Sequence, residues 1–187
     1  MIKIELERVD GDYGFEAKDA NGHTVRLDTS VEGGGTNFGV RPMQMLLMGL
    51  GGCSGIDIVS ILKKQRQTIE GFSMKIEGER EAGKEPSIWK NVTIVFELTG
   101  NIDPDKAKRA CELSMDKYCS VAETLRRAGG ELKWEVRVNQ LSPDNKQYAE
   151  GRGQRAEGRR QKAEGRRQKA EGRRQKAEGK EISGDAR

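Results

Sequence analysis

Alternation of apolar and polar positions predicts strands near both ends of the first 140 residues. Residues 2–9 alternate hydrophobic with charged side chains, as a half-buried strand does. Residues 15–18 and 23–29 flank Asp19-Ala20-Asn21-Gly22, and an Asn-Gly pair between two extended segments is typical of a β-hairpin. The same alternation predicts three further strands, at residues 72–81, 92–99 and 132–138.

The pattern becomes helical after a glycine-rich loop at residues 32–39. Pro42 is well placed for a first helical turn, and apolar side chains recur at helical spacing from residue 43 to about residue 66. These side chains occupy more than one side of the helix, so we expect it to be the buried centre of the fold. One small sheet would not cover such a helix, whereas a partner subunit could.

Two shorter helices are predicted before the last strand. Asp103 is an N-cap followed by Pro104 at the first position, and this helix should extend to about residue 117. Ser120 to Glu123 has the form of a capping box, which begins another helix that reaches residue 127. The element order is βββ-α-ββ-αα-β, and the fold class is α+β.

Charge divides the chain into two segments. From Ala149 to Arg187 there are 13 Lys and Arg against 7 Asp and Glu, which leaves 21 basic and 23 acidic side chains in residues 1–148. The basic segment repeats AEGRRQK three times, with one alanine as the only apolar residue of each repeat. Dense charge without apolar positions predicts disorder, so we divide the chain into a domain at residues 1–140 and a disordered basic tail at 141–187. The tail is either a weak phosphate-binding arm for nucleic acid or a repeat without function.

Several classes of protein are disfavoured by composition. We find no stretch near the ~18 apolar residues of a transmembrane helix, and a charged N-terminus is unlike a signal peptide, so no membrane is expected. Three cysteines without a secretory signal favour the reducing cytoplasm over a disulfide scaffold. A single histidine disfavours a multi-histidine metal site, and we predict no metal and no cofactor. The thiols are the remaining reactive groups.

The three cysteines have different predicted settings. Cys119 directly precedes a helix, where free N–H groups and the helix dipole should favour its thiolate. Cys53 lies about three turns inside the central helix, beyond the reach of the dipole, and is either a core residue or a reactive thiol activated by a nearby cation. Cys111 lies in mid-helix and is interpreted as structural.

Two sequence motifs around these cysteines resemble a known family. The stretch RPMQMLLMGLGGCSGIDIVSILKK around Cys53, and DKYCSVAETL around Cys119, are similar to the two cysteine motifs of the OsmC/Ohr family of osmotically inducible and organic hydroperoxide resistance proteins. The resemblance covers roughly residues 1–139 and is closest to the OsmC-like branch. It implies the OsmC/Ohr-like fold with a long buried central helix, and an intertwined homodimer with active sites at the interface.

The resemblance also implies thiol-based reduction of organic hydroperoxides in oxidative stress defence. Cys53 would attack the peroxide, and Cys119 would resolve the resulting sulfenic acid as a disulfide. A dithiol, such as the lipoyl group of a lipoylated protein, would then reduce that disulfide.

The chain departs from the peroxidase members of the family near Pro42. Those members carry a glutamate one or two residues after the proline that orients an activating arginine, whereas this chain has Met43 and Gln44. The candidates for the arginine are Arg26 and Arg41. His23 would either line the site or lie at the surface.

Two functions from other classes remain open. The chain could be a non-catalytic OsmC-like dimer that binds a small hydrophobic ligand, or senses redox state through its thiols. It could also be a nucleic-acid-associated protein that acts through its tail.

Overall fold

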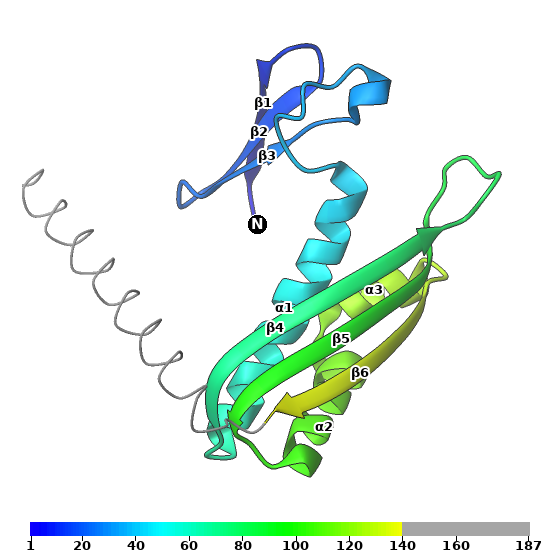
Figure 1. The fold of residues 1–187 in the computed structure, drawn as a ribbon. Coiled ribbons are helices and arrows are strands. Elements are labelled where there is room, and N and C mark those ends of the chain that lie inside the picture. Colours follow the sequence, from blue (N-terminus) through cyan, green and yellow to red (C-terminus); the bar gives the residue numbers. More distant parts are fainter. Residues whose placement is uncertain (140–187) are drawn as a thin grey trace, which may run out of the picture. The chain divides into compact units, whose positions relative to one another are not determined.

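The computed structural model describes residues 1–139, which form an α+β fold of two three-stranded sheets and three α-helices (Figure 1). The order of the elements is the predicted one, and each predicted strand and helix is found within a few residues of its expected bounds. The proposed domain boundary at residue 140 and the tail at 141–187 lie outside the described residues.

The first sheet is an antiparallel meander. It contains β1 (Ile4–Asp10), β2 (Gly14–Asp19) and β3 (Thr24–Leu27). The predicted hairpin turn joins β2 and β3, with Gly22 at a φ of 87°, a conformation that favours glycine. The Asp19 carboxylate closes this turn, because it accepts hydrogen bonds from the N–H groups of Asn21 and His23.

A buried carboxylate organises the glycine-rich loop after β3. Asp28 is 2% exposed and accepts hydrogen bonds from the backbone N–H groups of Thr29, Thr36 and Phe38. The loop then returns to β3 so closely that a Cβ at Gly39 would lie 2.3 Å from the carbonyl carbon of Arg26. The loop is therefore a fixed structure that sets where the central helix begins.

The second sheet contains β4 (Thr68–Arg80), β5 (Trp89–Asn101) and β6 (Glu131–Asn139) in that spatial order. β4 and β5 are antiparallel, whereas β5 and β6 are parallel. Parallel neighbours need a crossover connection, which is here built from the helical segments between β5 and β6.

This crossover differs from the prediction in two details. The predicted helix to residue 117 ends earlier, because α2 (Pro104–Leu113) continues as a π-helical segment, η2 (Ser114–Tyr118). The next helix, α3 (Ser120–Arg127), is capped by Cys119, whose sulfur accepts a hydrogen bond from the N–H of Ala122. Ser120 is thus the first residue of the helix and not its cap. The π-helical segment cannot be recognised from side-chain periodicity over five residues.

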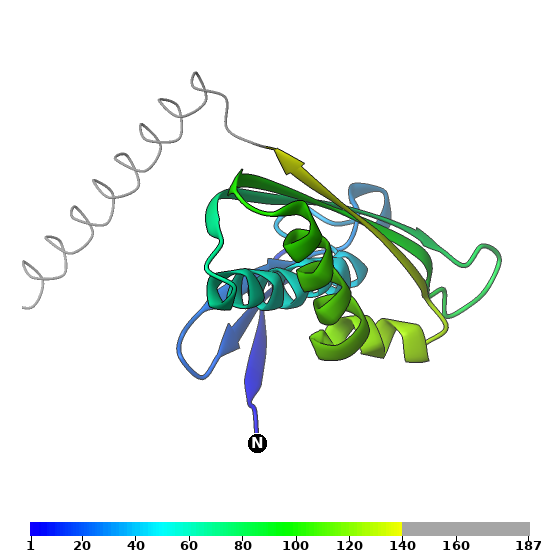
Figure 2. The same ribbon diagram turned by 90° about the horizontal axis from the view of Figure 1, so that it is seen from below.

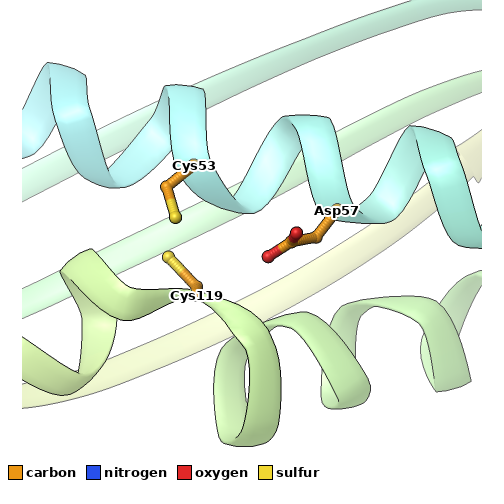
Figure 3. Close-up of side chains that lie close together, drawn as sticks. All are labelled: Cys53, Asp57 and Cys119. Carbon is orange, nitrogen blue, oxygen red and sulfur yellow. The ribbon is translucent and has the colours of Figure 1, made fainter.

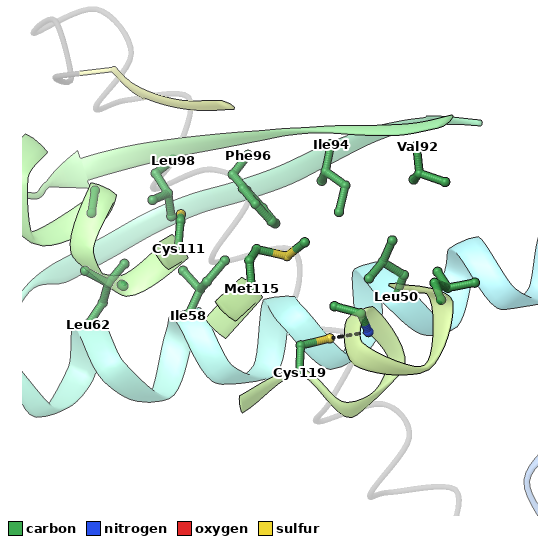
Figure 4. Packing of buried hydrophobic residues seen from close by; sticks show 14 of the residues in the cluster. Leu50, Ile58, Leu62, Val92, Ile94, Phe96, Leu98, Cys111, Met115 and Cys119 are labelled. Carbon is green, nitrogen blue, oxygen red and sulfur yellow. Dashed lines mark hydrogen bonds between the residues drawn. The ribbon is translucent and has the colours of Figure 1, made fainter. Parts of the chain in front are cut away.

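The three helices cover one face of the second sheet (Figure 2). The central helix α1 (Pro42–Lys64) contributes fully buried side chains at Leu50, Ile58 and Leu62. They pack in one cluster with buried residues of β5, which are at most 1% exposed, as the alternation predicted: Val92, Ile94, Phe96 and Leu98 (Figure 4). Gly51 allows β4 to approach α1, since a Cβ there would lie 2.8 Å from Cδ1 of Ile76.

One expectation about α1 needs correction. An 18-residue window of this helix has a mean hydropathy of 1.8, so by length and composition it could cross a membrane, contrary to the sequence estimate. Glycines, serines and sulfur-containing residues separate the aliphatic residues of α1, so its sequence contains no long uninterrupted aliphatic stretch. The core helix of a folded domain has the same composition, and α1 contributes six buried residues to the fold.

Apolar side chains remain exposed on a single chain. On α1, Met48 is 52% and Ile56 is 70% exposed. The first sheet also exposes hydrophobic residues, between 37% and 60% of each side chain: Ile4, Leu6, Val9, Phe15 and Val25. Residues 1–139 of a single chain thus expose a large apolar surface.

Candidate functional site

The central helix supplies two polar side chains to the candidate site. Cys53 and Asp57 are four residues apart on α1 and therefore lie on one face, one turn from each other. Both are half-buried. Between them in sequence, the Ser54 hydroxyl turns back to the carbonyl of Leu50, so it does not enter the site.

The crossover supplies Cys119 at the break between η2 and α3. Its backbone is extended, with φ −71° and ψ 99°, and its own N–H donates to the carbonyl of Ser114 at 2.8 Å. Its sulfur lies 3.4 Å from the N–H of Ala122, and the residue is only 3% exposed. The chain break thus holds the sulfur at a fixed position beneath α1.

The two thiols and the carboxylate meet although they are distant in sequence. Sγ of Cys53, Sγ of Cys119 and a carboxylate oxygen of Asp57 all lie within 4.8 Å of one another. Figure 3 shows the two sulfur atoms facing each other, with the Asp57 carboxylate beside them. Sulfur atoms this close are candidates for a disulfide.

The fully buried Ser114 joins the two elements that carry the site. Its hydroxyl lies 3.2 Å from Oδ2 of Asp57 and 3.3 Å from the carbonyl oxygen of Ser54, so its single proton is shared between these acceptors. Both acceptors belong to α1, whereas Ser114 begins η2. This hydroxyl therefore fixes the distance between the crossover and the face of α1 that carries Cys53.

The protonation of Cys119 differs from the sequence expectation. Burial, together with the neighbouring Cys53 thiol, raises the pKa of Cys119 from 9.0 to about 11, against the opposing effect of the Ala122 N–H. The expectation of a favoured thiolate was wrong because the cost of removing the charge from water exceeds the stabilisation at the start of α3. Cys119 is a protonated thiol at neutral pH.

Cys111 lies apart from this site. It is fully buried in the hydrophobic cluster, as Figure 4 shows. Burial, and to a lesser extent the charge of Glu112, raises the pKa of Cys111 to about 12. A thiol without access to solvent or to its anionic form is chemically inert.

A surface pocket opens beside Cys119. Its volume is about 560 Å³, and it is lined by residues of η2 and α3 that are mostly polar or charged, among them Asp116, Lys117 and Arg126. Arg126 also closes the π-helical segment, because its guanidinium donates to the carbonyl oxygen of Met115 at 2.6 Å. This arginine was not singled out from sequence, and its spacing alone would not have revealed it.

The other predicted site residues have partners elsewhere in a single chain. Arg26 lies 3.7 Å from Glu16 and 4.8 Å from the ring centre of Phe38. Gln44 accepts a hydrogen bond from the backbone N–H of Arg41 at 3.2 Å and so caps α1.

His23 is exposed and bonded to Asp19 across the β2–β3 turn. Within residues 1–139 of one chain, Cys119 and Asp57 are thus grouped with Cys53, whereas Arg26, Gln44 and His23 have the partners given above.

Asp57 is the site residue that the sequence reasoning missed. The available signal was its spacing of four residues from Cys53, since one carboxylate in the middle of an apolar helix must face a polar environment.

The fold and the paired cysteine motifs define the protein class. The family described as OsmC-like protein matches residues 33–135, and the chain belongs to this family. Among curated proteins, it is similar to protein YhfA of Escherichia coli, with 39% identity over 115 residues that cover 61% of this chain and 82% of that protein.

Solved structures agree on the fold. The structure of a protein from Aquifex aeolicus has 28% sequence identity to this chain and a TM-score of 0.66. The match covers 76% of this chain and 98% of that protein. The structure of an organic hydroperoxide resistance protein from Legionella pneumophila has 17% sequence identity to this chain and a TM-score of 0.52. This match covers 74% of this chain and 96% of that protein. At that identity the likeness concerns the fold alone.

Proposed function

We propose that the protein reduces organic hydroperoxides through Cys53 and Cys119. The observation that carries the proposal is the approach of the two sulfur atoms, within 4.8 Å, from segments 66 positions apart. Membership of the OsmC family, whose fold is shared by organic hydroperoxide resistance proteins, supports a redox role for this pair.

The different settings of the two thiols assign their roles. Cys53 is half-buried and can be reached by a peroxide, whereas Cys119 is 3% exposed and protonated. The Cys53 thiolate attacks the peroxide O–O bond, becomes a sulfenic acid and releases the alcohol after the leaving oxygen takes a proton. The Cys119 sulfur then attacks the sulfenic acid, a disulfide forms, and water leaves with the thiol proton.

Asp57 can act as the proton acceptor in this second step. The Cys119 thiol must lose a proton before it is nucleophilic, and the Asp57 carboxylate lies within 4.8 Å of both sulfur atoms. It can take that proton and pass it to the departing hydroxide. An external dithiol, such as a lipoylated protein, completes the cycle by reducing the disulfide.

The active form in this proposal is a homodimer. A second copy would cover the exposed apolar surface of α1 and of the first sheet. It would also bring Arg26 or Arg41 to the Cys53 sulfur, where a guanidinium favours the thiolate. The reaction requires reduced thiols, so the reducing cytoplasm is the compartment that we propose for it.

The test is intact-mass analysis after one equivalent of cumene hydroperoxide. Wild type should lose the mass of two hydrogen atoms, and peptide mapping should find a disulfide between Cys53 and Cys119. Cys119→Ser should stop at the Cys53 sulfenic acid, Cys53→Ser should not react, and Cys111→Ala should behave as wild type. A disulfide that involves Cys111, or three unreacted thiols, contradicts the proposal.

An apolar groove favours a second candidate, a module that binds a small hydrophobic ligand. The groove has a volume of about 380 Å³ and lies between α1 and β4, lined by Gly51, Gly52, Gly55, Ile56, Val59, Ser60, Phe72 and Met74. Binding of an apolar fluorescent probe by a protein that consumes no peroxide would make this second function the better one.

A further inference from the structure

We propose that Cys53, Asp57 and Cys119 form a binding site for Zn²⁺ that holds the thiol pair in its reduced form. The three potential ligand atoms lie within 4.8 Å of one another. The binding itself involves the residues of the proposed peroxidase but does not depend on that activity.

The positions of the three side chains are close to those that zinc requires. With Zn–S bonds near 2.3 Å and Zn–O bonds near 2.1 Å, tetrahedral zinc separates its ligand atoms by roughly 3.6 to 3.8 Å. The atoms need to approach by about 1 Å at most, which side-chain rotation supplies. Cys53 and Asp57 are already on one face of α1, so only the third ligand comes from another element.

Hydrogen bonds outside the site orient two of the three ligands. The Ser114 hydroxyl lies 3.2 Å from Oδ2 of Asp57, which leaves Oδ1 for the metal. The Ala122 N–H donates to the Cys119 sulfur and disperses part of its charge. Partners of this kind fix the direction of a ligand before the metal arrives.

Binding of a cation would compensate the negative charge of the three ligand groups. Two thiolates and a carboxylate would carry three negative charges in this half-buried cluster, which is costly unless a cation compensates them. Zinc replaces both thiol protons, so each bound Zn²⁺ releases two H⁺ and reduces the formal charge of two thiolates and a carboxylate from −3 to −1. Affinity should therefore increase with pH.

The donor set indicates the metal. Two thiolates and one carboxylate select a borderline-soft ion such as Zn²⁺ over Mg²⁺ or Ca²⁺. Three protein ligands leave a fourth position for water, as in exchangeable zinc sites. His23, the only histidine of the sequence, is exposed and hydrogen-bonded to Asp19. We therefore assign the fourth position to water and not to a histidine.

Bound zinc would slow the reaction of the thiol pair with peroxide. If the proposed function holds, oxidation of the zinc form consumes one hydroperoxide and two protons, and yields the disulfide, the alcohol, water and free Zn²⁺. The metal thus protects the pair from oxidation when peroxide is scarce, and leaves when the disulfide forms.

The experiment is titration of the reduced full chain with Zn²⁺ against a chromogenic chelator, without peroxide. One equivalent should bind, and Cys53→Ser or Cys119→Ser should weaken binding at least tenfold. Asp57→Asn should weaken it about tenfold, whereas the controls Asp105→Asn and Cys111→Ala should not change it. Absence of binding, or binding that survives loss of both Cys53 and Cys119, overturns the proposal.

Cobalt provides a readout that does not depend on variant stability. Co²⁺ added to wild type should give the thiolate charge-transfer and tetrahedral visible bands, and Zn²⁺ should abolish both. A spectrum of hexa-aqua cobalt contradicts the site. Peroxide consumption is measured separately in the presence of chelator, so a protein that binds zinc but consumes no peroxide refutes the proposed function and leaves the zinc site standing.

Discussion

At the scale of single residues, the site brings two thiols and one carboxylate into a half-buried cluster. The Asp57 carboxylate lies within 4.8 Å of both sulfur atoms. A cation beside this half-buried cluster would compensate negative charge that develops on either sulfur. An arginine from a second copy would serve the peroxidase reaction, and a metal ion would serve storage of the reduced pair.

The setting of Cys111 predicts a pH-dependent stability. Its pKa is raised from 9.0 to about 12, so the folded state keeps a proton that the unfolded state loses. This stabilisation is complete below pH 9 and is lost as pH rises through 9 toward 12, at about 1.4 kcal/mol per pH unit.

Urea unfolding across that range measures the effect. The free energy of unfolding of wild type should fall more steeply with pH than that of Cys111→Ala. Equal slopes would show that Cys111 titrates alike in the folded and unfolded states.

Replacement of Gln44 by glutamate is predicted to increase the rate of hydroperoxide consumption. Its amide oxygen now accepts the Arg41 N–H, and a glutamate would add a charge that holds an arginine by stronger hydrogen bonds. If Gln44→Glu restores about 1.4 kcal/mol of thiolate stabilisation, cumene hydroperoxide should be consumed about ten times faster. Alkylation of Cys53 should also occur at lower pH.

Gln44→Met is the control, because it removes the acceptor and should not accelerate the reaction. No change in either measurement for Gln44→Glu would indicate that this position does not orient the activating arginine.

At the scale of elements, most of the fold could be predicted because each element has a local cause. Alternation identified the strands, and Pro42 and Pro104 identified two helix starts. The π-helical segment η2 was missed, because it depends on contacts with α1 and on the Arg126 guanidinium. The cysteine motifs indicated Cys53 and Cys119, but the raised pKa of Cys119 depends on burial by elements distant in sequence.

The loop before α1 makes a prediction about backbone packing. A Cβ at Gly39 would meet the backbone of Arg26 and Leu27, which cannot move without disturbing β3. Gly39→Ala should therefore lower the free energy of unfolding by about 1 to 3 kcal/mol. The measurement is chemical unfolding.

Gly49→Ala is the comparison, because a Cβ there meets nothing within 4 Å in the described part of the chain. This change should stabilise α1 by roughly 0.5 to 1 kcal/mol in a monomer. A harmless Gly39→Ala would show that the loop adapts.

At the scale of the whole molecule, assembly is predicted not to need the repeat segment. Within the described residues 1–139, most of the exposed large apolar residues lie in α1 and the first sheet. Truncation after Asn145 should leave a dimer of correspondingly smaller mass, with nearly unchanged melting temperature. Analytical ultracentrifugation and thermal unfolding are the measurements, and a monomeric or unfolded product would contradict the prediction.

The parallel pairing of β5 with β6 also has a consequence during protein synthesis. Cys119 lies in the connection between these strands, and the crossover that carries it is closed only after β6 has emerged and joined the sheet. If Cys53 and Cys119 act as the proposed redox pair, a nascent chain would therefore hold the complete pair only after most of residues 1–139 has been translated.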